Sequence, residues 1–156
     1  MKSDLPHLKV PTLLRQHDLR PKKSLGQNFL TDETALRKVV AAAELNGDES
    51  VLEIGAGIGS LTRHLALAAG QVVAVEIDAK LLPLLRETLE SFGNVSIVQA
   101  DILQTDPREL MPVDRYIVVA NIPYYITSPI IQYLLESETQ PQRMILTVQR
   151  EVAERI

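Results

Sequence analysis

Residues 51–60 read VLEIGAGIGS, a short apolar run that breaks into three alternating glycines. Such a run, ended by glycines, is typical of a buried strand, which we place at residues 51–54. Glycines after a strand allow a tight turn and let the backbone approach a ligand beside the start of the next helix. The stretch therefore predicts a strand, a ligand-binding loop and a helix in immediate succession.

Strand and helix patterns alternate along the rest of the chain. Apolar, β-branched runs predict further strands at residues 72–76, 95–99, 116–120 and 144–149. Helical spacing predicts helices at residues 61–69, 81–89, 127–135 and 150–156. It also predicts an earlier helix with Thr31 or Asp32 as its N-cap and Gly47 as its stop. The alternation predicts an α/β fold, a Rossmann-like doubly wound parallel sheet with helices on both faces. Thr127-Ser128-Pro129 predicts a hydroxyl cap followed by proline at the first helical position.

The composition is that of a globular protein, with 156 residues, of which 46% are apolar and 23% charged. The absence of cysteine excludes disulfides and thiolate metal sites, and the three histidines lack metal-ligand spacing, so we expect no metal. No secretory signal and no apolar run of about 20 residues is present. We therefore expect a cytoplasmic protein without a membrane partner.

The charge is unevenly distributed, because residues 1–30 carry a net charge of +4 and the other 126 residues carry −8. We expect residues 1–24, which contain three prolines and at most a short helix at 13–18, to form a basic N-terminal arm. Residues 25–156 are expected to form the sheet domain. A basic arm on an acidic body fits either a phosphate-binding segment or a solvated tail.

Three carboxylates are expected at the carboxyl ends of strands, where doubly wound sheets bind ligands. Glu53 precedes the glycines, where it would repel a pyrophosphate but suit the sulfonium and amino group of S-adenosylmethionine. Glu76 can accept both hydroxyls of a ribose, and Asp101 the amine of an adenine. The alternative for Asp101 is a turn residue, and Asp78 is expected to cap the next helix.

The fourth strand ends in Asn121-Ile122-Pro123-Tyr124-Tyr125. The Asn121 side-chain oxygen and the Ile122 carbonyl can accept the N–H groups of an exocyclic amine, while Pro123 fixes the backbone between them and the next residue. Tyr124 offers an aromatic face on which a flipped base can stack. Singly, these residues also suit a turn and half-buried packing, but together they indicate methylation of an amino group on a base.

These motifs resemble the ribosomal RNA adenine N6,N6-dimethyltransferase family, most closely its bacterial small-subunit type. The matching segments are residues 22–30 (KKSLGQNFL), 53–62, 76–78, 101–102, 121–129 (NIPYYITSP) and 149–153. The resemblance implies a class I S-adenosylmethionine-dependent methyltransferase fold that dimethylates two adjacent adenosines near the 3′ end of small-subunit (16S) ribosomal RNA. Family members continue with further strands and a C-terminal helical domain. We therefore expect an N-terminal piece that binds the cofactor but is nearly inactive alone.

Residue by residue, the resemblance assigns S-adenosylmethionine contacts to Asn28, Leu30, Gly55, Glu76, Asp101 and Asn121. It assigns the catalytic roles to Asn121, Pro123 and Tyr124, and RNA contacts to Lys22, Lys23, Gln27 and Phe29. The expected partner is small-subunit ribosomal RNA or the pre-30S particle, and the chain is expected to be a monomer.

Three alternatives remain open. A large-subunit methyltransferase of the macrolide-resistance type shares similar motifs, although the tyrosine pair and residues 21–24 favour the small-subunit enzyme. The glycines and Glu76 alone would fit an NAD-dependent oxidoreductase. A non-catalytic RNA-binding assembly factor is a third possibility, against which the intact motif at residues 121–124 argues.

Overall fold

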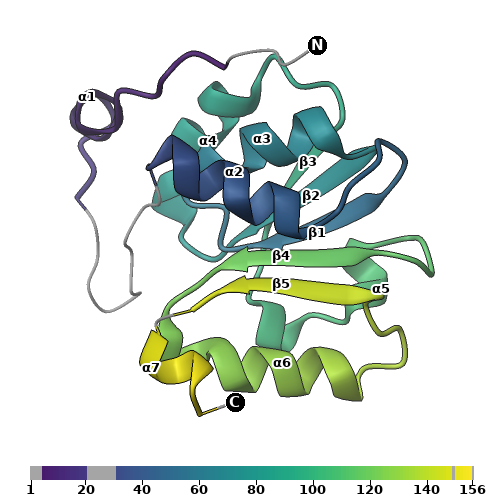
Figure 1. Ribbon diagram of the computed structural model, residues 1–156. Coiled ribbons are helices and arrows are strands. Elements are labelled where there is room, and N and C mark those ends of the chain that lie inside the picture. Colours follow the sequence, from purple (N-terminus) through teal and green to yellow (C-terminus); the bar gives the residue numbers. More distant parts are fainter. Residues whose placement is uncertain (1–4, 21–30, 149, 156) are drawn as a thin grey trace.

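A computed structural model of the chain describes residues 5–20, 31–148 and 150–155 (Figure 1). Within these residues, five parallel strands form one sheet in the order β3-β2-β1-β4-β5. The strands are β1 (Ser50–Ile54), β2 (Gln71–Glu76), β3 (Val95–Gln99), β4 (Ile117–Asn121) and β5 (Arg143–Thr147). The Rossmann-like sheet predicted from the sequence is confirmed.

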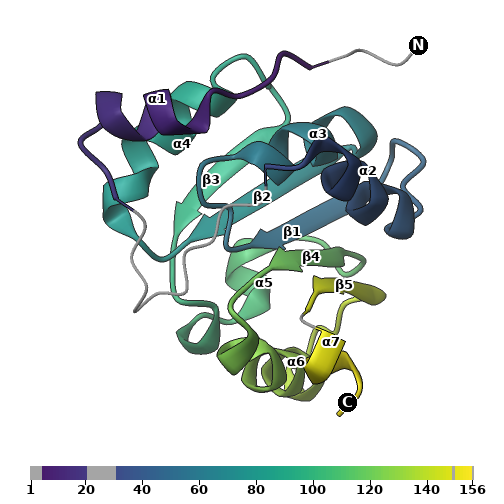
Figure 2. The same cartoon turned by 60° about the vertical axis from the view of Figure 1, so that its left-hand side comes forward.

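Helices cover both faces of this sheet. The α-helices are α1 (Val10–Gln16), α2 (Glu33–Ala42), α3 (Ser60–Ala68), α4 (Leu82–Leu89), α5 (Pro107–Leu110), α6 (Thr127–Glu136) and α7 (Arg150–Ala153). Single 3-10 turns occur at η2 (Ala79–Leu81), η3 (Ile102–Gln104) and η4 (Tyr124–Ile126). Helices α2, α3 and α4 lie on one face, and α5 and α6 lie on the other (Figures 1 and 2). None of the helices described has the length and apolar character needed to cross a membrane.

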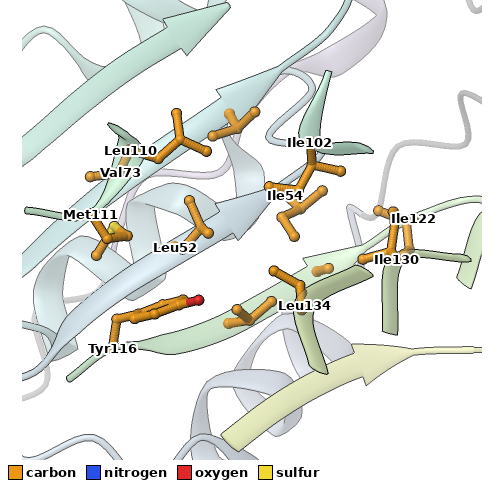
Figure 3. Packing of buried hydrophobic residues seen from close by; sticks show 13 residues of the cluster. Leu52, Ile54, Val73, Ile102, Leu110, Met111, Tyr116, Ile122, Ile130 and Leu134 are labelled. Carbon is orange, nitrogen blue, oxygen red and sulfur yellow. The ribbon is translucent and has the colours of Figure 1, made fainter. Parts of the chain in front are cut away.

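Alternate residues along a strand pack into two different apolar layers, one on each face of the sheet. Leu52 of β1 packs in the layer that contains Ile130 and Leu134 of α6, as Figure 3 shows. Its neighbour Val51 packs in the other layer, with Leu65 of α3. Burial on both faces explains why the strands read as nearly continuous apolar runs.

The strand order places a topological switch point beside β1. The chain runs from β1 to β2 and β3 on one side, and then crosses to β4 and β5 on the other. Connections that leave neighbouring strands in opposite directions open a crevice at the carboxyl ends, where such sheets bind ligands.

Three local predictions need correction. The first helix covers Val10–Gln16 rather than residues 13–18, and α2 ends at Ala42, well before Gly47. Thr127 is already helical and provides no cap, because its hydroxyl lies 3.4 Å from the Pro123 carbonyl oxygen, to which it donates. The prediction of Thr31 or Asp32 as the N-cap of α2 is confirmed for Asp32, whose carboxylate accepts from the N–H of Thr34 at 2.9 Å.

The described part of the N-terminal segment packs against the sheet domain. Val10 lies in an apolar cluster with Ile58 of the glycine loop and Leu84 of α4. His17 and Glu87 approach to 2.7 Å, so a polar contact adds to this packing. The division into an arm of residues 1–24 and a domain of residues 25–156 stays a prediction.

Candidate active site

A cleft of about 900 Å³, including its open mouth, lies at the carboxyl ends of β1, β2, β3 and β4. Five predicted site residues line it together: Gly55, Glu76, Asp101, Asn121 and Pro123. The described fold therefore brings into one place residues that are up to 68 positions apart in the sequence.

The glycine loop passes close to the neighbouring strand. Gly55 has φ +78°, and a Cβ atom there would lie 3.3 Å from Ile122 Cγ2 and 3.4 Å from the Asn121 carbonyl oxygen. Gly59 has φ +90° and leads directly into α3. Only glycine adopts these conformations without strain, so the loop brings the backbone after β1 to the end of β4.

The backbone donors of this loop are largely engaged within the protein. The N–H groups of Gly55 and Ala56 both donate to the Val75 carbonyl, at 2.9 and 3.0 Å. The N–H of Gly57 donates to the Glu76 carboxylate at 2.8 Å. A pyrophosphate cradle requires free N–H groups, so this arrangement argues against a dinucleotide.

Acidic residues dominate the polar lining of the cleft. Glu53, Glu76 and Asp101 line it, and no lysine or arginine is among the described lining residues. A cleft with one sign of charge favours ligands of the opposite sign. The site therefore suits a cationic ligand rather than a phosphorylated one.

Glu76 is held in place by two backbone donors. Its carboxylate accepts from the N–H of Gly57 and, at 2.9 Å, from the N–H of Asp78. Burial raises the pKa of Glu76, and these backbone hydrogen bonds lower it in part. A carboxylate has about four acceptor positions, so acceptor capacity remains beside these bonds for the hydroxyls of a ribose.

Glu53 lies deeper, with 1% of its surface exposed. The Thr62 hydroxyl of α3 donates to its Oε2 at 2.5 Å. Burial raises the pKa of Glu53 to about 8, against the opposite effect of this hydrogen bond. Glu53 is therefore a proton-carrying group at neutral pH that a nearby cation would ionise.

Asp101 and Asp78 follow β3 and β2, and they are the N-caps of the 3-10 turns η3 and η2. Asp101 Oδ1 accepts from the N–H of Leu103 at 3.0 Å, so the residue forms the turn that was the alternative interpretation and also lines the cleft. Asp78 Oδ1 accepts from the N–H of Lys80 at 3.0 Å, which confirms the predicted cap. The turn leaves Asp101 Oδ2 as a further acceptor at the end of β3.

The predicted amine site lies at the end of β4. Asn121, Ile122 and Pro123 line the cleft, and the backbone of Tyr124 begins η4 directly after them. Tyr125 is half-exposed. The catalytic roles assigned to Asn121, Pro123 and Tyr124 stay predictions.

Several predicted contacts fall outside the described residues, namely Lys22, Lys23, Gln27, Asn28, Phe29 and Leu30. Conversely, the cleft contains lining residues that the sequence reading did not single out, including Ser60, Ile77 and Ile130. Ile77 follows Glu76 directly and remains half-exposed at the lip, a position that its apolar character alone does not reveal. The described residues contain no cluster of acidic and histidine side chains suited to a metal.

Known proteins resemble the chain over most of its length. The profile of the ribosomal RNA adenine dimethylase family matches residues 19–156. The protein named ribosomal RNA small subunit methyltransferase A from Ligilactobacillus salivarius is 45% identical, over 100% of this chain and 56% of its own length. The protein of that name from Dehalococcoides mccartyi is 41% identical, over 100% and 57%. The chain thus spans about half the length of the curated relatives it matches.

Solved structures show the same fold. The 23S rRNA methyltransferase ErmE superposes with a TM-score of 0.73 at 39% identity, over 81% of this chain and 50% of that one. A dimethyladenosine transferase from Plasmodium falciparum gives a TM-score of 0.71 at 30% identity, over 82% and 46%.

Proposed function

Since the chain belongs to the ribosomal RNA adenine dimethylase family, we propose that it serves the transfer of methyl groups from S-adenosylmethionine to N6 of adenosine in small-subunit ribosomal RNA. The names of relatives at 41–48% identity support the small subunit. The proposed targets are two adjacent adenosines near the 3′ end of 16S RNA, modified by a monomer on the pre-30S particle in the cytoplasm.

The observation that carries this proposal is the acidic cleft beside Asn121-Ile122-Pro123. S-adenosylmethionine has a sulfonium and an ammonium cation, which the acids around the cleft would favour, Glu53 by losing its proton when the cation binds. The internal use of the Gly55, Ala56 and Gly57 N–H groups disfavours the pyrophosphate of NAD. The oxidoreductase alternative therefore has less support.

Residues at the carboxyl ends of different strands would bind different parts of the cofactor. Glu76 would accept the two ribose hydroxyls with the acceptor positions that Gly57 and Asp78 leave open. Asp101, at the end of β3, would accept the adenine amine through Oδ2. Gly55 lets the backbone approach the amino-acid end beside β4.

The end of β4 would orient the target amine. When bound, S-adenosylmethionine supplies an electrophilic methyl group on its sulfonium. The Asn121 side-chain oxygen and the Ile122 carbonyl would accept the two N–H groups of N6 and favour a tetrahedral nitrogen whose lone pair is aimed at that methyl. Catalysis would then consist mainly of positioning and electrostatics. No strong base is required, because the proton can leave to water after transfer.

The large-subunit alternative has weaker support. The 23S rRNA methyltransferase ErmE is 39% identical to the chain, less than the 45% of the small-subunit relative from Ligilactobacillus salivarius. The non-catalytic alternative requires a defective amine site, whereas Asn121, Ile122 and Pro123 are all present at the cleft.

Mass spectrometry of ribosomal RNA from cells that lack the gene for this chain tests the proposal. We expect N6,N6-dimethyladenosine to disappear from small-subunit RNA and to return with the wild-type gene but not with Asn121→Ala. Loss from large-subunit RNA alone would favour the macrolide-resistance type. Unchanged methylation in both subunits would refute the proposed function.

A further inference from the structure

We propose that residues 5–19, which we call the strap, position the glycine loop for S-adenosylmethionine and so raise its affinity without contacting it, with Val10 as the positioning residue. This inference rests on the function proposed above and assigns part of the cofactor affinity to a segment outside the cleft. None of the described residues that line the cleft belongs to the strap.

The strap contacts both helices that pack beside the glycine loop. Near its start, the Pro6 carbonyl accepts from the Arg63 guanidinium of α3 at 2.5 Å. Near its end, His17 Nε2 and Glu87 Oε2 of α4 lie 2.7 Å apart. Between these contacts, α1 packs beside α4 (Figure 2). The described part of the expected arm is therefore attached to both helices.

Ile58 connects the strap to the cleft. It lines the cleft, exposes 1% of its surface and packs in one cluster with Val10 of the strap. Four leucines of the strap pack against the same cluster, namely Leu8, Leu13, Leu14 and Leu19. One side chain thus belongs both to the wall of the cleft and to the contact with the strap.

The backbone on either side of Ile58 makes this contact important. Gly57 and Gly59 have φ values of +61° and +90°. Glycine has access to more backbone conformations than any other residue, so a side chain between two glycines depends in part on its packing for its position. The contact with Val10 supplies that packing from outside the cleft.

A second connection leads from the strap toward Glu76. Leu81 lies in the same cluster as Val10 and ends η2, the turn whose N-cap is Asp78. The N–H of Asp78 donates to the Glu76 carboxylate at 2.9 Å. The strap therefore packs against the turn after β2 as well as the loop after β1, and both of these lead out of strands that end at the cleft.

Thermodynamic linkage makes this coupling reciprocal. If docking of the strap raises the affinity for the cofactor by some factor, the cofactor must stabilise docking of the strap by the same factor. Amide hydrogen exchange reports the local opening of such a segment. Bound S-adenosylmethionine should therefore slow exchange in α1, although α1 lies outside the cleft.

The test compares Val10→Ala with Val40→Ala, which makes the same side-chain change in α2, beside an apolar cluster that does not contain Ile58. Calorimetric titration with S-adenosylmethionine should show binding weakened about three- to tenfold for Val10→Ala, within the range that a residue between two sites contributes to their coupling. The dissociation constant of Val40→Ala should equal that of the wild-type chain.

Hydrogen exchange separates positioning from a merely structural role. In the wild-type chain, saturating S-adenosylmethionine should slow exchange of the amides of residues 13–17, and the protection should be smaller in Val10→Ala. If Val10 only stabilised the fold, its substitution would lower the temperature of unfolding but leave the affinity and this protection unchanged.

Circular dichroism checks that each variant is folded. Should Val10→Ala be unfolded, His17→Ala, which removes the contact with Glu87, takes its place with the same expectation. Unchanged affinity in the folded strap variant, equal weakening in Val40→Ala, or exchange in wild-type α1 that is independent of the cofactor would overturn the role of the strap. A wild-type chain that does not bind S-adenosylmethionine would overturn the proposed function itself, and with it this inference.

Discussion

The carboxylate of Glu76 accepts a hydrogen bond from the N–H of Gly57 at 2.8 Å, which joins the end of β2 to the glycine loop after β1. The residue proposed to bind the ribose therefore also fixes the loop beneath the cofactor. Because both functions depend on one carboxylate, a change at Glu76 should affect the position of the loop as well as the contact with the cofactor.

We expect Glu76→Ala to weaken S-adenosylmethionine binding by roughly 1.5–3 kcal/mol, the scale of hydrogen bonds to a charged group. Calorimetric titration measures the change, and circular dichroism checks the fold. Glu90→Ala, at the exposed glutamate that forms the C-cap of α4, serves as the control and should leave the affinity unaltered. An unchanged dissociation constant for folded Glu76→Ala would exclude it as the ribose ligand.

Glu53 should make the free energy of unfolding depend on pH. Its pKa of about 8 in the folded protein exceeds the ordinary glutamate value of 4.5, so the folded state holds a proton that the unfolded state releases between these values. Stability is therefore fully present below about pH 4.5 and falls as the pH rises toward 8, by up to roughly 1.4 kcal/mol per pH unit.

Glu53→Gln should remove this contribution, because the amide does not titrate and its oxygen can still accept from Thr62. Urea unfolding at several pH values between 5 and 8 measures the difference between variant and wild type, which should grow with pH. Glu90→Gln should retain the wild-type slope. Parallel profiles for Glu53→Gln and wild type would contradict a proton on buried Glu53.

Gly59→Ala should destabilise the protein by roughly 1–3 kcal/mol, the cost of a strained backbone position. Gly59 has φ +90°, and its added Cβ would lie 3.0 Å from Thr88 Cγ2 and 3.2 Å from Leu85 Cδ1. Gly93→Ala is the matched control, since no atom lies within 4 Å of a Cβ there. Similar unfolding midpoints for the two variants would show that the backbone conformation at position 59 does not require glycine.

In a protein that also carries the family's C-terminal domain, Asn121→Ala should slow methyl transfer by about 10²–10³, the loss associated with one preorganised polar group at a transition state. RNA affinity should change little, because phosphate contacts dominate it. Filter binding and tritium transfer from labelled cofactor, measured on the same preparation, separate the two effects. Turnover within a few-fold of wild type would mean that Asn121 does not orient the amine.

The sheet could be predicted because both of its faces are buried. Burial on both sides produces apolar runs such as residues 72–76, whose position differs from that of β2 by one residue. Helix α5 and the turn η3 were not predicted, since three or four residues are too short to show a helical period. The early end of α2 depends on residues after Ala42, among them Glu44, whose φ of +51° has no clear sequence signal.

The residues of the cleft could be predicted in part. Gly55, Glu76, Asp101 and Asn121 were found because parallel strands place their carboxyl ends together. The hydrogen bond from Thr62 to Glu53 could not be predicted, because it joins a strand and a helix through side-chain geometry alone.

The most direct test of the central claim, that this cleft binds S-adenosylmethionine, is calorimetric titration of the wild-type chain with S-adenosylmethionine and, separately, with NAD. The acidic lining and the engaged loop donors predict saturable binding of S-adenosylmethionine with one site per chain, and no measurable heat of binding for NAD. Binding of NAD without binding of S-adenosylmethionine would contradict the account.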